Sequence, residues 1–184
     1  MRTIPRDSFH LTVTRSPLAT PTPTHRTLVG ELATRQHGVV TRADLVQLGI
    51  PKVTVLRWLA DGYLRPVHRA VFAVGHGDLS FAGRCAAAVL ACGPNARLTG
   101  AALAYLHGAI RYAPNRIDVV TTDRRRVWLD GVRVRHARHI RGDERSTWNG
   151  IRCVTTARML VDMADRTGAT ELAAVMHELA FIGE

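Results

Sequence analysis

The chain has 184 residues, a formal net charge of +10 and 46% apolar residues, which allows one domain or two small ones with a packed core. No apolar run approaches the length of about 18 residues that a membrane-spanning helix needs, and the N-terminus lacks the apolar stretch of a signal peptide. Three cysteines without a C-x-x-C spacing exclude a disulfide scaffold and fit the reducing cytoplasm, where we expect the protein to work without membrane contact.

The excess of positive charge suggests an anionic partner, and nucleic acid is the usual one. Lys52 is the only lysine, so the strong use of arginine indicates a GC-rich genome rather than a binding site. The arginines are unevenly distributed. Residues 27–75 carry six basic and three acidic side chains, residues 111–145 carry ten arginines and five acids, and residues 146–184 are net acidic.

Residues 1–26 are rich in proline and threonine and predict a disordered leader, or a start upstream of the natural one. From Thr27 the residues Leu28, Leu32 and Ala33 fall on one helical face, which predicts a helix that Gly38 ends.

Thr41 is the predicted N-cap of a second helix, with Asp44 completing a weak capping box. Gly49 ends this helix and Pro51 opens a third one. In the third helix Val55 and Leu59 share the inward face.

Residues 63–75 alternate enough to predict a two-stranded ribbon with Leu64, Val67, Val71 and Val74 as apolar positions. The order of helix, helix, tight turn, helix and hairpin over residues 27–75 is typical of a winged helix-turn-helix. In this fold two helices and a hairpin support a third helix, which can enter the major groove of DNA.

Residues 76–184 predict a small α+β domain, so the fold class is α+β, with a winged helix-turn-helix first. Helices are predicted over residues 80–93, 99–109, 157–168 and 169–181, and strands over residues 116–122, 131–138 and 150–156.

Two groups of basic and polar residues are candidate nucleic-acid contacts. The first group lies on the third helix and the hairpin: Lys52, Thr54, Arg57, Arg65, His68 and Arg69. The second basic patch lies in the second domain: Arg124, Arg125, Arg126, Arg133 and Arg135. A protein-contact surface is the alternative for the third helix, and a solvated hairpin is the alternative for Arg65, His68 and Arg69. The second patch fits RNA or DNA backbone, an acidic protein surface, or a solvated sheet face.

Residue patterns for catalysis and metal binding are weak, so we predict no enzyme, no metal and no cofactor. Cys85 and Cys92 lie on one helical face, which indicates core positions rather than metal ligands. His136 and His139 form an H-x-x-H pair, and a zinc site needs more ligands than these two. No D/E-x-K triplet is present. The remaining acids are scattered: Asp118 and Asp123 near a strand, and Asp162, Asp165, Glu171 and Glu178 on helix positions that we expect to be exposed.

Four stretches, "ATRQHGVVTRADLVQLGI", "GYLRPVHRAVFAVGH", "AAAVLACGPNARLTGAALAYLHG" and "GIRCVTTARMLVDMAD", resemble the AbiEi-type antitoxin family of actinobacteria over roughly residues 27–180. The resemblance implies a winged helix that represses its own operon by binding the promoter as double-stranded DNA. It also implies a second domain that counters a nucleotidyltransferase-like toxin in a type IV toxin–antitoxin system.

The chain departs from the family pattern in two ways. Leu56, Trp58, Ala60 and Asp61 stand where related third helices are commonly basic. Many chains with this N-terminal half also continue into a very-short-patch-repair-like endonuclease domain, whereas this sequence ends at "HELAFIGE". The alternative reading is therefore the non-catalytic targeting half of such a nuclease, truncated before its catalytic domain.

Overall fold

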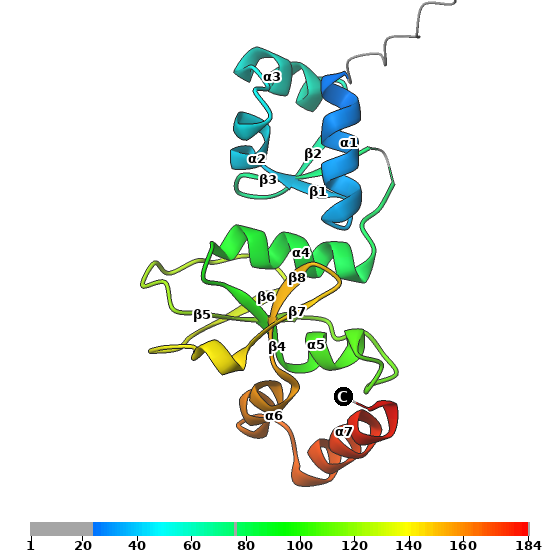
Figure 1. Ribbon diagram of the computed structural model, residues 1–184, viewed down its shortest axis with the longest axis vertical. Coiled ribbons are helices and arrows are strands. Elements are labelled where there is room, and N and C mark those ends of the chain that lie inside the picture. The colour runs from blue at the N-terminus through cyan, green and yellow to red at the C-terminus, as the bar shows by residue number, and fades with distance from the viewer. Residues whose placement is uncertain (1–23, 76, 184) are drawn as a thin grey trace, which may run out of the picture.

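The computed structural model describes residues 24–75 and 77–183. Of the leader predicted over residues 1–26, residues 1–23 lie outside the described part. Thr24 caps the first helix, which begins at His25 rather than at Thr27. The described residues form a mixed α and β fold with seven α-helices and two sheets, and none of their helices has the length and apolar character needed to cross a bilayer. Figure 1 shows the first domain stacked above the second, with helix α4 between them.

The first domain contains three helices and a three-stranded antiparallel sheet. Its elements are α1 (His25–Arg35), β1 (Val39–Thr41), α2 (Arg42–Gln47), α3 (Lys52–Ala60), β2 (Leu64–His68) and β3 (Val71–Val74). The three helices and the β2–β3 hairpin confirm the predicted element order. Strand β1 was not predicted, because three residues are too few for an alternating pattern to be visible. It pairs with β3, so the sheet order is β1-β3-β2.

Local hydrogen bonds explain why α2 begins and ends where it does. The Thr41 hydroxyl accepts from the Asp44 backbone N–H at 3.1 Å, and the Thr41 N–H donates to the Asp44 carboxylate at 2.7 Å, which is a full capping box. Gly49, with φ of +69°, follows the helix in the left-handed conformation that glycine adopts without strain. Leu45 then packs into the core of this domain with Val29, Val40 and other apolar side chains.

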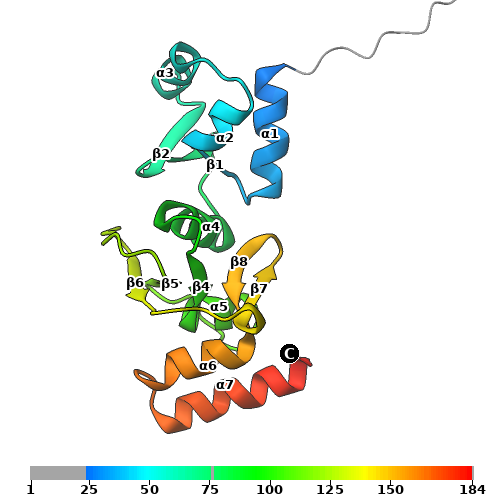
Figure 2. The ribbon, with the colours of Figure 1, turned by 60° about the vertical axis from the view of Figure 1, so that its left-hand side comes forward.

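The second domain is a five-stranded mixed sheet with helices on both faces. Its elements are α4 (Phe81–Cys92), β4 (Arg97–Thr99), α5 (Gly100–Leu106), β5 (Ile117–Thr121), β6 (Val132–His136), a 3-10 turn (Gly142–Glu144), β7 (Arg145–Trp148), β8 (Ile151–Val154), α6 (Thr156–Ala164) and α7 (Ala169–Ile182). The strand order is β6-β5-β4-β8-β7. Helix α4 covers the face toward the first domain, and α5, α6 and α7 lie on the opposite side (Figures 1 and 2).

All the predicted helices and strands of this domain are present, and Ser80 caps α4 by accepting from the Gly83 N–H. Strands β4 and β7 were not predicted. β4 has three residues, and β7 is the polar, mostly exposed sequence Arg145–Trp148, so neither carries an apolar alternation. Cys85 and Cys92 are buried in the core, as predicted.

Contacts of α4, β7 and the β7–β8 turn with the first domain hold the two domains together. Val39 and Val71 of the first domain belong to the same buried cluster as α4 and the second sheet. The His37 imidazole is hydrogen-bonded to the Asn149 carbonyl at 2.7 Å. A side chain at Gly83 would place its Cβ 2.6 Å from the His37 carbonyl oxygen, so α4 approaches this close only because it carries a glycine there.

Candidate nucleic-acid interface

Trp58 anchors helix α3 to the first domain. It is 3% exposed and meets the Tyr63 ring edge-on at 5.1 Å between ring centroids, while the Tyr63 hydroxyl donates to the Arg26 carbonyl. Val55 and Leu59, which the periodicity placed inward, are only partly buried against the same core. The inward face of α3 is therefore centred on Trp58, which packs against Tyr63 just before the hairpin.

The outward face of α3 is mixed in character. Lys52 and Arg57 are exposed, and Thr54 is partly buried. Between the two basic side chains lie Val53 and Leu56, which are 72% and 56% exposed. This face can donate charged hydrogen bonds to phosphate or base edges, and its aliphatic groups can contact thymine methyl groups.

The three hairpin candidates have different environments. Arg69 is exposed at the β2–β3 turn. Arg65 is half-buried, and its guanidinium donates to the Gly75 carbonyl at 3.1 Å and to the Gly77 carbonyl, so it fastens the segment that leaves the hairpin. His68 is partly buried. Burial lowers the pKa of His68 from its usual value of 6.5, although the negative charge of Asp130 acts to raise it. The imidazole is therefore mainly neutral at pH 7.

Arg42 lies at the hairpin turn, although no residue pattern in the sequence selects it. Its backbone N–H donates to the Ala70 carbonyl at 2.9 Å, which places the first residue of α2 beside the hairpin turn. The Arg42 residue is exposed, and Arg69 directly precedes the Ala70 that accepts this hydrogen bond. The only sequence signal was its position directly after the N-cap Thr41.

The second basic patch divides into two parts. Arg124, Arg125 and Arg126 are exposed in the loop between β5 and β6. Arg133 and Arg135 lie on β6 and are held by carboxylates: Arg133 by Asp118 at 3.2 Å, and Arg135 by Asp162 and by Asp165, the latter at 3.2 Å. Three of the five arginines are therefore exposed in the loop, and the other two are paired with carboxylates.

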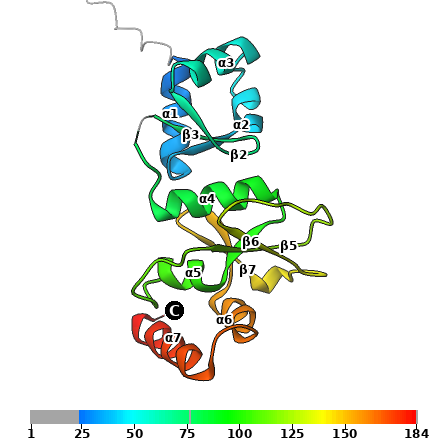
Figure 3. The ribbon, with the colours of Figure 1, turned by 180° about the vertical axis from the view of Figure 1, so that it is seen from behind.

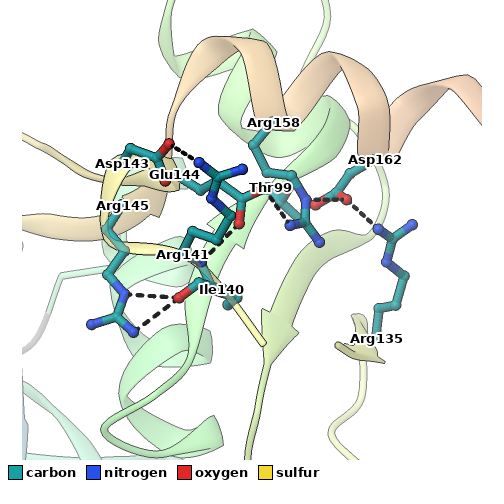
Figure 4. A network of polar contacts seen from close by, with 9 residues as sticks. All are labelled: Thr99, Arg135, Ile140, Arg141, Asp143, Glu144, Arg145, Arg158 and Asp162. Carbon is teal, nitrogen blue, oxygen red and sulfur yellow. Dashed lines mark hydrogen bonds and ion pairs between the residues drawn. The ribbon is translucent and has the colours of Figure 1, made fainter. Parts of the chain in front are cut away.

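The prediction that Asp162 is exposed is wrong. Its side chain is 2% exposed, and it accepts hydrogen bonds from the Thr99 hydroxyl at 2.8 Å, from Arg158 Nε at 2.9 Å and from Arg135 (Figure 4). Arg158 in turn donates to Glu144 at 3.0 Å, and these bonds raise the Arg158 pKa. A buried carboxylate persists because cations and a hydroxyl satisfy it.

The other candidate acids are engaged separately. Burial raises the pKa of Asp118, while Arg133 and Arg166 oppose the shift. The Asp123 carboxylate accepts from the Asn95 amide at 2.7 Å. The two carboxylates thus have different partners and do not converge on a shared site. Within residues 24–75 and 77–183, no group of three or more His, Cys, Asp or Glu side chains is arranged to hold a metal ion.

Comparison with known proteins bears on the first domain. No curated protein matches the chain. A family model described as "Transcriptional regulator, AbiEi antitoxin" matches residues 29–75, which run from α1 to the end of the β2–β3 hairpin. This match confirms the resemblance over the segment that carries α3 and Arg69: residues 29–75 are similar to the AbiEi antitoxin family of transcriptional regulators.

Proposed function

We propose that the protein is a DNA-binding transcriptional regulator whose first domain is a winged helix-turn-helix. Helix α3 enters the major groove, and the β2–β3 hairpin is the wing that lies along the phosphates. The observation that carries the proposal is the anchoring of α3 through Trp58, which leaves Lys52 and Arg57 exposed on its outer face, together with the exposure of Arg69 at the hairpin turn. The family match over residues 29–75 supports the same role.

The cations of this domain do not contribute equally to the proposed interface. Lys52, Arg57 and Arg69 are exposed, and we assign them to DNA contacts. Arg65 is committed to backbone carbonyls, and His68 is neutral at pH 7, so both act mainly by shaping the wing. If each of these three cations neutralises one phosphate, the first domain contributes a salt slope of about −3, at about 0.9 log unit per neutralised phosphate.

Fluorescence anisotropy with a labelled duplex from the protein's own promoter tests the proposal. Arg57→Ala should weaken the specific duplex by about 1–3 kcal/mol if Arg57 reads a base edge, and Arg69→Ala should weaken all duplexes alike. The matched control is Arg111→Ala, an exposed arginine in the loop between α5 and β5, which should bind like the wild type. Salt-independent binding, or equal affinities for all four proteins, would refute the proposal.

We further propose, on the family resemblance, that the regulator represses its own operon and that the second domain counters a nucleotidyltransferase-like toxin. The chain then acts by binding rather than by catalysis. Co-expression with the toxin encoded by the adjacent gene should restore bacterial growth, and deleting the second domain should abolish the rescue while the toxin stays expressed. Growth arrest in the presence of the intact chain would contradict the antitoxin role.

A protein-contact role for the first domain is the second candidate. The observation that favours it is the exposure of Val46 on α2 and of Val53 and Leu56 on α3, because exposed apolar side chains that lie together mark protein interaction sites. The two roles separate in the anisotropy experiment. A protein-contact module would leave the promoter duplex unbound at low salt, and it would lose its partner when Leu56 is replaced by a charged residue.

A further inference from the structure

We propose that duplex DNA bound by the first domain also contacts the second domain, through the arginine loop, which we define as residues 122–131 between β5 and β6. The interface would then be composite and longer than α3 and the wing alone. This inference rests on the proposed DNA-binding function and names a further part of its surface.

A groove of about 960 Å³ connects the two domains on one side of the molecule. One wall is formed by α2 and the hairpin turn, including Gln47 and Arg69. The other wall is formed by the end of α4 and the arginine loop, including Arg124 and Arg125. Figures 1 and 3 show α2, the hairpin turn and the tip of the β5–β6 loop on the same side of the fold.

The charge of the groove is predominantly positive. Arg69, Arg124 and Arg125 form no ion pair with any other residue of the part that the structure describes. The two acids of the lining are already hydrogen-bonded: Asp44 to the Thr41 backbone N–H, and Asp123 to the Asn95 amide.

The fourth arginine of the lining, Arg152, has a supporting role. Its guanidinium donates to the Gly93 carbonyl at 3.0 Å and to the Pro94 carbonyl. These bonds fix the turn after α4. This turn and the arginine loop line the same wall of the groove. Counting partners only within residues 24–75 and 77–183, the groove presents three cations without an ion pair on a supported backbone.

The two walls are held in a fixed relation by the packing between the domains. Val71, which lines the groove, is 1% exposed and belongs to the core cluster of the second domain. On β7 and in the turn that follows it, Trp148 stacks on His37 at 6.2 Å between ring centroids, and Asn149 is hydrogen-bonded to the same imidazole. The cations of the two domains are consequently pre-arranged for one ligand, with little ordering required on binding.

Trp128 lies outside the groove, in a separate hollow with Asn115 and Val132, and is an independent sign that the loop contacts a partner. It follows the three arginines and is 96% exposed, whereas its neighbours Val127 and Leu129 pack partly against the core. A fully exposed tryptophan is unusual on a surface that contacts only water, and tryptophan with arginine is the pair most enriched where binding energy is concentrated. Aromatic and apolar side chains of DNA-binding loops also contact sugars and base edges.

Continuity with the proposed DNA surface selects duplex DNA as the occupant. Arg69 belongs both to the wing and to the groove, so a duplex whose phosphates reach Arg69 is led toward Arg124 and Arg125. Arginine is also the residue that best matches phosphate geometry. An acidic protein would meet the same charges, and it is one of the outcomes of the test.

The test compares Arg124→Ala/Arg125→Ala with Arg57→Ala and with the control Arg111→Ala, in anisotropy titrations against the promoter duplex at several salt concentrations. The double variant should reduce the salt slope by about 2, close to 0.9 per lost phosphate contact, and Arg111→Ala should leave it unchanged. Extending the duplex by about one helical turn, roughly 10 base pairs, on the side of the wing should tighten the wild type and not the double variant.

Tryptophan fluorescence gives a second measurement. Acrylamide quenching of Trp128 should fall when the duplex is added, and the change should be absent in Trp128→Phe. The double variant should keep the wild-type circular dichroism spectrum, because exposed arginines do not hold the fold.

The outcomes separate this proposal from the function on which it rests. If Arg57→Ala loses binding while the double variant keeps the wild-type affinity and slope, the first domain binds DNA and the composite surface is refuted. If the double variant instead loses binding to the toxin, the loop is a protein-contact surface. If the wild type does not bind the duplex, both proposals fail.

Discussion

Replacing Asp162 tests whether buried charge holds helix α6 against the second sheet. Its carboxylate receives hydrogen bonds from Thr99, Arg158 and Arg135, and the side chain is almost fully buried. Removing one partner of a buried ion pair costs about 3–5 kcal/mol, because the other charge stays buried and unpaired. In Asp162→Ala, Arg158 retains Glu144 at 3.0 Å and Arg135 retains Asp165 at 3.2 Å. We therefore expect a loss at the lower end of that range, about 3 kcal/mol in the free energy of unfolding.

Asp165→Ala is the matched control because it pairs with the same arginine. Its side chain is 73% exposed, and an exposed ion pair contributes at most about 1 kcal/mol. The measurement is urea unfolding followed by circular dichroism and tryptophan fluorescence. The slope of the unfolding free energy against urea concentration should be the same in all variants, so that the differences report stability alone. The free energy of unfolding of Asp162→Asn should lie between those of Asp162→Ala and Asp165→Ala, since the new amide oxygen can still accept a hydrogen bond from Thr99.

Equal stabilities of Asp162→Ala and Asp165→Ala would refute this reasoning. Helix α6 would then be held by its apolar face, through Met159 and Met163, and the network drawn in Figure 4 would add no net stability.

Four further predictions follow from individual environments. Trp58→Ala should lower the free energy of unfolding by about 3–5 kcal/mol, measured by urea titration, because the cavity cannot close; a loss under about 1 kcal/mol would contradict the anchoring of α3. Burial raises the pKa of Cys85 to about 12 and that of Cys92 to about 11, so Ellman's reagent should react slowly with the native protein and fully after denaturation. His68→Gln should leave the pH dependence of DNA affinity unchanged between about pH 7 and 8, since a lowered pKa keeps the imidazole neutral there; a changed profile would show a charged wing histidine. Plasmid, single-stranded DNA and RNA should stay intact with the protein and Mg²⁺, and cleavage that is lost in Asp118→Ala would overturn this.

The sequence by itself determined the local structure of the protein. Thr41 with Asp44, Ser80 before α4, and Gly49 after α2 mark helix ends, because capping bonds and left-handed turns join residues only a few positions apart. Apolar periodicity predicted every helix and the longer strands for the same reason. Strand β1 has too few residues to show a pattern.

Only the tertiary structure decided which charges are free. Asp162 reads as a surface residue in the sequence, yet Thr99 and Arg135, 63 and 27 positions away, make it a buried acceptor. Likewise, nothing in the sequence joins Arg69 to Arg124. They line one groove because α4 packs against both sheets, and such contacts depend on the shapes of surfaces that the chain forms only after it has folded.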